Sequence, residues 1–184
     1  MSAASAHFIR RIPDGEDRER LTCADCGYIA YENPKIVTGS VVSVDGRILL
    51  CRRAIEPRRG FWTIPAGYME LGETVEEAAR REALEEACAE IALEGVLALY
   101  SIARIGQVQV LFRASLATPG FAAGPESLEV QLFGWEEIPW ADLAFPSVHW
   151  VLKAWREAGP GPLGAPRTNP PDDMRGTRPL QGGV

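Results

Sequence analysis

Residues 67–89 read GYMELGETVEEAARREALEEACA, and they predict the central helix of the fold. Thr74 and Glu77 have the spacing of a capping box, in which the Thr hydroxyl and the Glu carboxylate satisfy free backbone N–H groups at a helix start. Helix-forming Ala, Arg, Glu and Leu follow, without Gly or Pro, as far as about Ala87. We therefore expect a helix that starts after Thr74 and ends near Ala87.

Three glutamates of this helix are expected on one face. Glu82, Glu85 and Glu86 stand at positions i, i+3 and i+4, which a helix brings together. Like charges at this spacing cost about 0.2–0.5 kcal/mol per pair, so we expect positive charge nearby. Hard divalent cations prefer oxygen ligands, and carboxylates on a rigid helix can hold one. The alternative is a solvated helix face on which the glutamates form salt bridges with Arg80 and Arg81.

The flanking sequence predicts a sheet. Residues 35–44 are rich in β-branched side chains, Asp45-Gly46 is typical of a hairpin turn, and residues 47–52 form the returning strand. Three further strand-like runs follow the helix, at residues 91–101, 107–116 and 128–135. The predicted fold class is α+β, with a mixed β-sheet packed between helices.

The chain is expected to divide into three parts. Residues 147–157 have the apolar spacing of a second helix, with Ser147 in the N-cap position, so the folded core is predicted over residues 35–157. Residues 1–34 are polar and broken by Pro and Gly, which indicates an N-terminal extension. Residues 158–184 are rich in Pro and Gly, and we expect disorder there because they offer little apolar surface to bury.

Composition and charge exclude several classes of protein. The chain has 184 residues, with 19 Lys and Arg against 25 Asp and Glu, and a formal net charge of −6. This acidic balance disfavours a protein that coats nucleic acid, and no apolar run approaches the roughly 18 residues of a membrane span. The start of the chain has no apolar stretch typical of a secretory signal. We therefore expect a cytoplasmic protein whose four cysteines form no disulfide framework.

The acidic motif resembles the signature of a known enzyme family. Its Gly and its charged residues stand in the register GX5EX7REUXEEXGU of the Nudix hydrolases. These residues are Gly67, Glu73, Arg81, Glu82, Glu85 and Glu86. Further segments look like the branch of FAD and ADP-ribose pyrophosphatases, namely CADCGYIAYENPK, GFWTIPAGYMELGE, IGQVQVLF and ESLEVQLFGWEEIP. The resemblance covers residues 12–157 and implies a Nudix fold with a short N-terminal extension like a zinc ribbon.

The resemblance implies metal-dependent hydrolysis of the pyrophosphate bond in a nucleoside diphosphate linked to another moiety. ADP-ribose or FAD would be the substrate, and Mg²⁺ or Mn²⁺ the cofactor. In the family pattern Glu82 and Glu86 would be the principal metal ligands, and the carbonyl of Ala66 a further one. Glu85 would be a third ligand or would orient the attacking water, so that Glu85 and Glu86 are the catalytic glutamates of the motif.

Other residues receive supporting roles from the same resemblance. The residues expected to brace the motif loop by pairing with each other are Arg81 and Glu73. A downstream glutamate often serves Nudix enzymes as a base or an extra ligand. Glu129 is favoured for that catalytic role, which leaves Glu126 as a contact for the substrate. Trp62 and Tyr68 flank the loop, and their rings either stack on a base or flavin or pack in the core.

Two positions depart from the family pattern. The second Gly of the motif is Cys88, where a Gly would supply a left-handed helix end that costs a residue with a Cβ about 1–2 kcal/mol. We expect Cys88 to be a small buried residue rather than a reactive thiol. Relatives carry two CxxC pairs near the N-terminus, whereas this chain has only Cys23 and Cys26. Because structural zinc usually takes four protein ligands, we interpret the pair as a vestigial zinc site, and Zn²⁺ is not expected unless two chains share it.

The sequence also leaves alternative functions open. NADH or dinucleoside polyphosphates are alternative substrates, although residues 100–107 replace the SQPWPFPxS-type segment of NADH pyrophosphatases. A non-hydrolytic nucleotide sensor would normally lose the acidic residues, which this chain keeps. A zinc-ribbon module that binds nucleic acid would need four cysteines and a basic face. The expected partners are a small-molecule nucleotide and a second copy in a homodimer, and neither nucleic acid nor a membrane.

Overall fold

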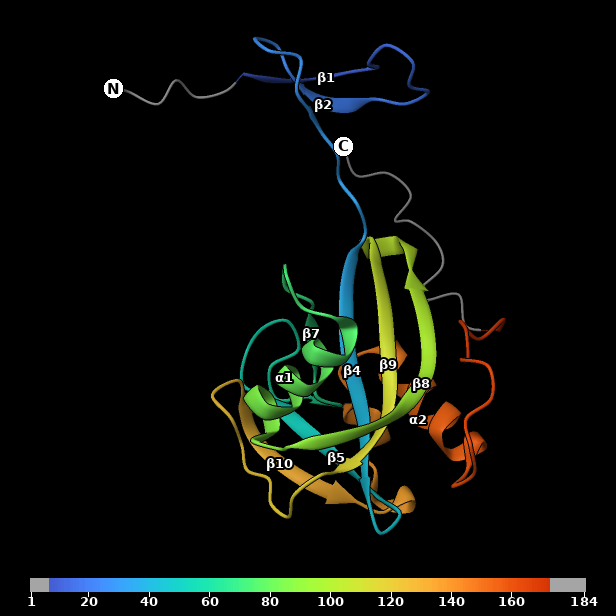
Figure 1. The fold of residues 1–184 in the computed structure, drawn as a ribbon. Coiled ribbons are helices and arrows are strands. Elements are labelled where there is room, and N and C mark those ends of the chain that lie inside the picture. Colours follow the sequence, from blue (N-terminus) through green and yellow to red (C-terminus); the bar gives the residue numbers. More distant parts are fainter. Residues whose placement is uncertain (1–6, 173–184) are drawn as a thin grey trace. The chain divides into compact units, whose positions relative to one another are not determined.

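The computed structural model describes residues 7–172, and the chain divides into two compact units between Pro34 and Lys35. The strands of the first unit are β1 (Phe8–Arg11), β2 (Arg20–Cys23) and β3 (Ile29–Ala30). They form a three-stranded antiparallel sheet in the order β1-β2-β3 (Figure 1). Within residues 7–34 only Pro13, Thr22 and Cys23 are buried, so the described part of this unit has almost no core.

The second unit is built on a seven-stranded mixed sheet. Its strands are β4 (Lys35–Val44), β5 (Arg47–Arg53), β6 (Trp62–Thr63), β7 (Ala66–Tyr68), β8 (Ile91–Ile102), β9 (Gln107–Leu116) and β10 (Ser127–Phe133). The order is β10-β5-β4-β9-β8, with β6 beside β5 and β7 beside β4. β4 and β9 run parallel, whereas the other pairs are antiparallel. As predicted, Asp45 and Gly46 join β4 to β5, both with the positive φ (49° and 75°) that a tight hairpin turn requires.

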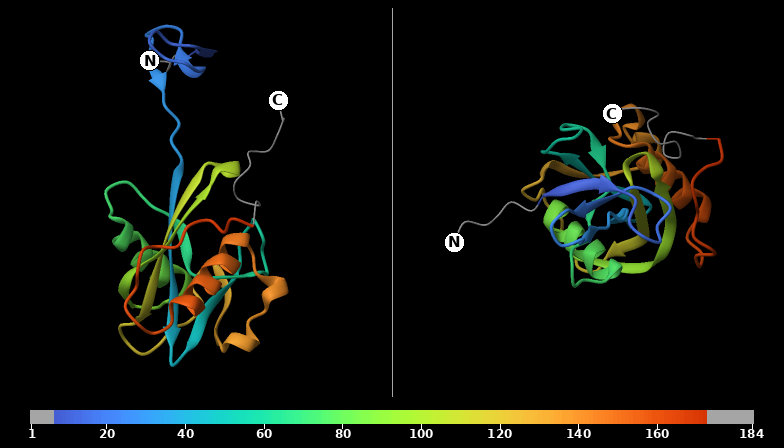
Figure 2. Two further views of the ribbon diagram at one scale, coloured as in Figure 1. Left: turned by 90° about the vertical axis from the view of Figure 1, so that its right-hand side faces the viewer. Right: turned by 90° about the horizontal axis from the view of Figure 1, so that it is seen from above.

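Two α-helices in the described part of this unit cover opposite faces of the sheet. They are α1 (Val75–Ala87) and α2 (Pro146–Ala158), and Figure 2 shows the sheet between them. Under α1, Ala83 and Ala87 pack on Val42 and Ala114, and these small side chains let the helix lie close to the strands. The mixed sheet between helices confirms the predicted fold class. No helix within residues 7–172 is long and apolar enough to cross a membrane.

Both ends of α1 are capped, and the start agrees with the sequence prediction. Thr74 Oγ1 accepts from the N–H of Glu77 at 3.2 Å, and the N–H of Thr74 donates to Glu77 Oε2 at 2.7 Å. At the other end Cys88 has the left-handed conformation (φ 46°, ψ 34°) that the family Gly would adopt, and its N–H donates to Leu84 O at 2.9 Å. Cys88 is exposed, so the expectation of a buried residue was wrong.

The start of α2 differs from the expectation. The helix begins at Pro146, with Phe145 as its N-cap, and no side chain caps it. Ser147 therefore lies inside the first turn and is not the N-cap. Proline is favoured at the first helical position because its ring fixes a helical φ, and the N–H that it lacks would have had no partner within the helix.

The segment after α2 also differs from the expectation of disorder. Residues 159–169, which we call the strap, lie along the free edge of β8. The N–H of Arg167 donates to Leu97 O at 2.9 Å, and the N–H of Leu99 donates to Arg167 O at 2.8 Å. Asn169 makes two further hydrogen bonds with the backbone of Ser101. A sheet edge offers unpaired N–H and C=O groups, and pairing with them offsets the entropy lost on ordering, which composition does not predict.

The strap is also held at its beginning and middle. Arg113 Nη1 donates to the carbonyl of Gly159 at 2.9 Å, and Leu163 packs against the cluster of buried residues under α2. The part of the predicted disordered tail at residues 173–184 lies outside the described residues.

Candidate functional site

The carboxylates of Glu82 and Glu86 face β7 from α1. The N–H of Ala66 donates to Glu86 Oε2 at 3.0 Å. The next residue, Gly67, lies directly against the carboxylate of Glu82, so that a Cβ at this position would overlap it. The first Gly of the motif is therefore required by the close approach of helix and strand. Its φ is not in the left-handed region, so space rather than backbone conformation explains the glycine.

Both of these carboxylates are buried, with 8% of Glu82 and 5% of Glu86 exposed. Burial raises the pKa of Glu82, and the neighbouring Arg81 opposes the shift only in part. Burial likewise raises the pKa of Glu86 to about 7, although its hydrogen bond from Ala66 favours the charged form. Further positive charge beside these two desolvated acids would stabilise their ionised forms.

Arg81 is the central cation of the motif. Its Nε and Nη2 bind the two carboxylate oxygens of Glu73 at 3.0 and 2.8 Å, a bidentate geometry. Its Nη1 is 2.7 Å from Glu82 Oε1 and 2.9 Å from Glu85 Oε2. Nη2 also donates to the carbonyl of Tyr68 at 3.0 Å. One guanidinium therefore joins the motif loop, β7 and three glutamates. Its hydrogen bond to Glu73 also lowers the pKa of that carboxyl group.

The donor set fits a hard divalent cation. The Glu82 and Glu86 carboxylates lie on one side of the helix, and the carbonyl of Ala66 belongs to the residue whose N–H already holds Glu86. Within residues 7–172 no three His, Cys, Asp or Glu side chains are grouped closely enough to enclose a metal ion. Glu85 is instead turned toward Arg81. It would join the other two carboxylates by leaving that guanidinium.

The loop between β9 and β10 brings another acid to the site. Ala122 N–H donates to Ala87 O at 2.8 Å and Gly124 N–H to Glu86 O at 3.1 Å, so the loop caps the C-terminal end of α1. The carboxylate of Glu126 follows this cap. After the larger effect of burial, its negative charge contributes to the raised pKa of both Glu82 and Glu86.

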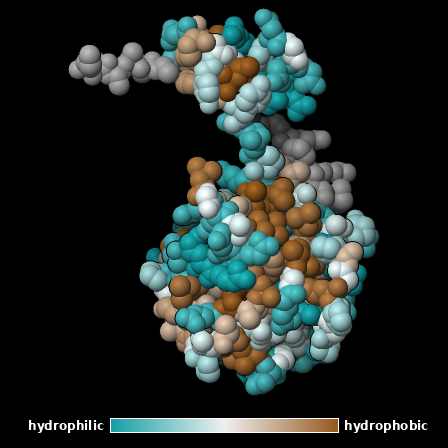
Figure 3. All heavy atoms as spheres, viewed as in Figure 1, coloured by the Kyte–Doolittle hydropathy of each residue, from teal (hydrophilic) through white to brown (hydrophobic). Residues whose placement is uncertain are grey.

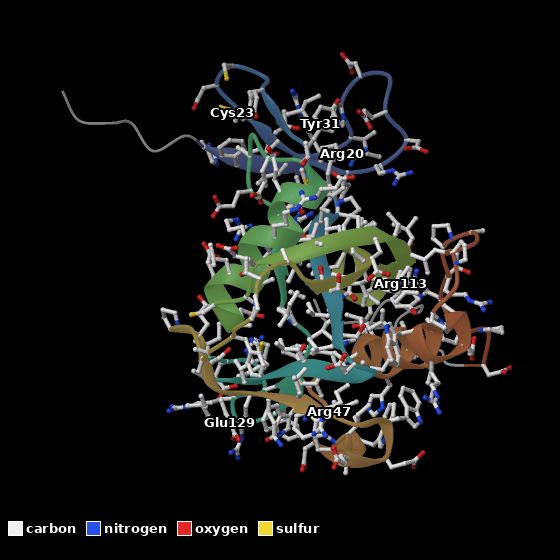
Figure 4. All side chains as sticks on the ribbon, turned by 60° about the horizontal axis from the view of Figure 1, so that its bottom comes forward. Arg20, Cys23, Tyr31, Arg47, Arg113 and Glu129 are labelled. Atoms are coloured by element: carbon white, nitrogen blue, oxygen red, sulfur yellow. The ribbon has the colours of Figure 1, made fainter. Side chains whose placement is uncertain are left out.

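Glu129 has different surroundings. It lies on β10, the edge strand of the sheet (Figure 4), and its Oε2 is 3.7 Å from Arg52 Nη1 in a half-exposed ion pair. It is therefore the charge of Glu126, rather than that of the favoured Glu129, that acts on the motif glutamates. Gly124 is the residue of the sequence that could have distinguished Glu126 from Glu129. A Cβ at this position would collide with the carbonyl of Glu85, so the glycine marks where the loop packs on the end of α1.

The two aromatic candidates have different environments. Trp62 is 9% exposed and packs edge to face on Phe133, with ring centroids 4.9 Å apart. It belongs to the core under α2, so the prediction that Trp62 contacts substrate is not supported by its position. Tyr68 is 50% exposed; its hydroxyl accepts from Gln107 Nε2 at 2.9 Å, and Lys35 Nζ is 5.2 Å from the ring centroid. Of the two candidates, Tyr68 is therefore the one that presents its ring at the surface.

Sequence reasoning missed Arg53, a cation of the site. Arg53 ends β5, and its charge lowers the pKa of Glu86 against the effect of burial. Its Nε donates to the carbonyl of Pro57, and its guanidinium lies 5.4 Å from the ring of Phe145. The sequence offers Arg52 and Arg53 side by side at a strand end. Because neighbouring side chains point to opposite faces, only the register of β5 shows which of them approaches Glu86.

The cysteine pair lies in the first unit, where both thiols are free. Cys23 is buried and Cys26 is exposed. Backbone N–H groups of Cys26 and Asp25 are directed at the sulfur of Cys23 and lower the pKa of its thiol. The sequence predicts a vestigial zinc site at this pair. The structure shows a turn that carries two free thiols.

Comparisons with known proteins bear on the whole chain. The model of the NUDIX domain matches residues 34–155, which is more than half of the sequence and includes every motif residue. The chain belongs to the Nudix family. A second model, the zinc-ribbon family described as Nudix N-terminal, matches residues 5–32. The first unit is therefore related to a zinc ribbon although it contains only one CxxC pair.

Individual relatives agree with this assignment. A crystal structure of a NUDIX hydrolase from Nitrosomonas europaea is 43% identical, with a TM-score of 0.84, and covers 92% of this chain and 97% of its own. An ADP-ribose pyrophosphatase of Methanocaldococcus jannaschii is 29% identical over 116 residues, 61% of this chain and 69% of the relative. The NAD-capped RNA hydrolase NudC of Haemophilus influenzae is 39% identical over 75 residues, which is 28% of that relative. The chain is an enzyme of the Nudix hydrolase family, whose members generally use divalent metals.

Proposed function

We propose that this Nudix hydrolase splits the pyrophosphate bond of ADP-ribose or FAD, with Mg²⁺ or Mn²⁺ as its cofactor. The observation that carries the proposal is the buried pair Glu82 and Glu86: burial raises both pKa values, so added positive charge would stabilise the ionised carboxylates. A divalent cation that also binds a diphosphate would supply it. The similarity to an archaeal ADP-ribose pyrophosphatase supports the choice of substrate.

The residues of the site have separate tasks in this proposal. Glu82, Glu86 and the carbonyl of Ala66 hold the metal, and Glu85 joins them. The metal would neutralise charge that develops on the phosphate oxygens during in-line attack by water. We assign the base that accepts the proton of the attacking water to Glu126, because its loop caps the end of α1 and its charge acts on both buried glutamates.

Two further side chains would contact the substrate. Arg53 lies near Glu86 and offers a guanidinium to a phosphate, which it can bind in a bidentate manner. Tyr68 presents its exposed ring beside the motif loop for stacking on a base or on a flavin. The same guanidinium of Arg81 contacts the carbonyl of Tyr68 and the carboxylate of Glu82.

A screen of substrates with either metal tests this function. ADP-ribose should yield AMP and ribose 5-phosphate, and FAD should yield AMP and FMN, in a reaction that a chelator stops. Glu86→Gln should remove most of the turnover, while Glu76→Gln, on an exposed position of the same helix, should not. The proposal fails if ADP-ribose, FAD, NADH and diadenosine polyphosphates all stay intact with both metals.

A second candidate is the hydrolysis of NADH or of dinucleoside polyphosphates. The local identity to NudC favours it, but that match spans only 28% of the relative. Residues 100–107 stand where NADH pyrophosphatases have their SQPWPFPxS-type segment. Here Tyr100 is buried in the core, and Ala103–Ile105 form a single-turn helix, η1. The same screen separates the candidates by relative kcat/KM. A nucleotide sensor without hydrolysis would instead bind a nucleotide and leave it intact.

We also propose that the protein is a homodimer. The register pairs Ile36 with Val108 and Leu99 with Val110, so these side chains share one face of β4, β9 and β8. Ile36 and Leu99 are exposed there, and Figure 3 shows apolar side chains gathered on this face. Exposed apolar patches often mark interaction sites. Light scattering should give twice the chain mass, and Leu99→Lys should halve it; a monomeric wild type would contradict the proposal.

A further inference from the structure

The turn between β2 and β3 holds two thiols in a fixed backbone. The N–H of Cys23 donates to Tyr28 O at 2.8 Å, and the carbonyl of Cys23 accepts from Gly27 N–H at 2.9 Å. Gly27 has a φ of 75°, which favours glycine at this position. The hydrogen bond from Gly27 to Cys23 closes a helix-like turn, in which the first and fourth residues are neighbours, and a disulfide needs Cα atoms about 4.4–6.8 Å apart. The two residues at these positions are Cys23 and Cys26.

The side chains of the pair converge. The side chain of Cys26 is within hydrogen-bonding reach of the Cys23 thiol, and the N–H groups of Cys26 and Asp25 point at the same sulfur. Cys23 is 5% exposed at the end of β2, where Figure 4 marks it, whereas Cys26 is open to solvent. A small reagent can therefore reach Cys26 first, and Cys23 stands behind it.

The first unit contains no other cysteine that could pair with these thiols. The remaining cysteines belong to the second unit, where Cys51 is buried in the cluster under α1 and Cys88 is at the end of that helix. A structural zinc ion would want four ligands, and in the described range 7–172 no three metal-ligating side chains are grouped together. The first unit nevertheless has only three buried residues within 7–34, and units of this size usually gain stability from a metal or a cross-link.

We propose that Cys23 and Cys26 form a redox-active dithiol, which closes to an intrachain disulfide by exchange with a low-molecular-weight disulfide such as glutathione disulfide. The pair would have kept the sulfur geometry of a zinc ribbon and acquired the chemistry of two adjacent thiols. This site belongs to the first unit and does not depend on the proposed hydrolysis.

The exchange takes two steps. The Cys26 thiolate attacks one sulfur of glutathione disulfide, the S–S bond breaks, and one glutathione leaves as a thiolate while a mixed disulfide forms on Cys26. The Cys23 thiolate then attacks the Cys26 sulfur, the second glutathione leaves, and the bond between Cys23 and Cys26 forms. The two glutathione thiolates take up the two protons that the cysteines released. Two electrons and two protons thus pass from the dithiol to the glutathione disulfide.

The test uses the full chain, reduced and then equilibrated with mixtures of glutathione and glutathione disulfide. After rapid alkylation, the intact mass should show a species without glutathione in which two thiols are protected, and dithiothreitol should restore both. Cys23→Ser should stop at one glutathione on Cys26. Cys88→Ser, which removes an exposed thiol of the other unit, should close as the wild type does.

Three results would overturn the proposal. The wild type could carry glutathione on Cys26 without closing, at every ratio of the two glutathione forms. The disulfide could link two chains, which a non-reducing gel shows. The purified chain could also contain zinc that protects both thiols from alkylation until a chelator removes it, in which case the pair is a metal site shared between chains.

Discussion

At the scale of single residues, Glu86 combines a role in the site with a cost in stability. Its pKa rises from the ordinary 4.5 to about 7, first because of burial, so the folded chain binds this proton more tightly than the unfolded chain does. The contribution of Glu86 to the free energy of unfolding should therefore be highest below pH 4.5. It falls as the pH rises through the window between these two values, and it reaches a lower plateau above pH 7.

Replacing Glu86 by Gln should reverse this cost while abolishing activity. The amide keeps an acceptor for the N–H of Ala66 and carries no charge to desolvate. Without metal, the variant should be more stable than the wild type by up to about 3 kcal/mol at about pH 8, and equal to it near pH 4. Urea unfolding in the presence of a chelator measures the difference. A variant that is less stable than the wild type at the higher pH would contradict the account.

A methyl group at position 67 should damage the site more than the fold. Gly67→Ala places a Cβ where the Glu82 carboxylate lies, so the carboxylate must move, while the backbone conformation at this position tolerates alanine. We expect metal-dependent activity to fall about 10–100-fold, with a small change in Tm. Gly161→Ala is the control, since nothing lies within 4 Å of the Cβ added there. Equal activity of the two variants would show that Glu82 is not held by this contact.

At the scale of elements, the loop of residues 117–126 decides which acid reaches the site. Because it caps α1 and carries Glu126 toward the motif, Glu126→Gln should lower kcat by about 10²–10⁴-fold, the range for loss of a general base. Glu129→Gln should change kcat little, because this residue pairs with Arg52 on the edge strand. Steady-state kinetics with saturating metal measures both variants. The opposite order would return the catalytic role to Glu129.

The elements differ in how far the sequence predicts them. α1 follows from local signals, since the capping box at Thr74 fixes its start and the run of helix formers continues to Ala87. The hairpin at Asp45 and Gly46 is equally local. The position of Glu126 depends instead on a loop that bonds to a helix distant in sequence. The exclusion of Trp62 from the site likewise depends on its packing against Phe133, which no local pattern shows.

At the scale of the whole molecule, the strap protects an edge. β8 would otherwise end the sheet with a long row of unpaired N–H and C=O groups, which favours pairing with other chains. A chain that ends at residue 158 should therefore aggregate on warming, whereas a chain that ends at residue 172 should keep the mass of the full-length protein. Light scattering during a thermal ramp compares the two. Identical behaviour would mean that the strap does not protect the edge.

The amino-acid composition of the strap predicts disorder, but the structure shows the strap ordered by its contacts with the rest of the fold. Its Pro and Gly content is typical of disorder, yet single residues along it make specific contacts, such as the amide of Asn169 with Ser101 and the side chain of Leu163 with the core. These contacts are favourable only because β8 and α2 are already in place. A segment with little structure of its own is ordered here by the edge that it covers, and the family match, which ends at residue 155, does not include it.

The parallel pairing of β4 with β9 has a consequence for synthesis. Lys35 begins β4 and lies opposite Gln107, about 70 residues later, and α1 with its glutamates is encoded between the two strands. As the chain leaves the ribosome, the helix therefore emerges before the central strand has its parallel partner. Long-range strand pairing is slow because loop closure comes before any stabilising contact. The acidic helix α1 therefore stays partly exposed until translation has passed residue 116, the end of β9. Slower translation between the two strands should prolong this exposure.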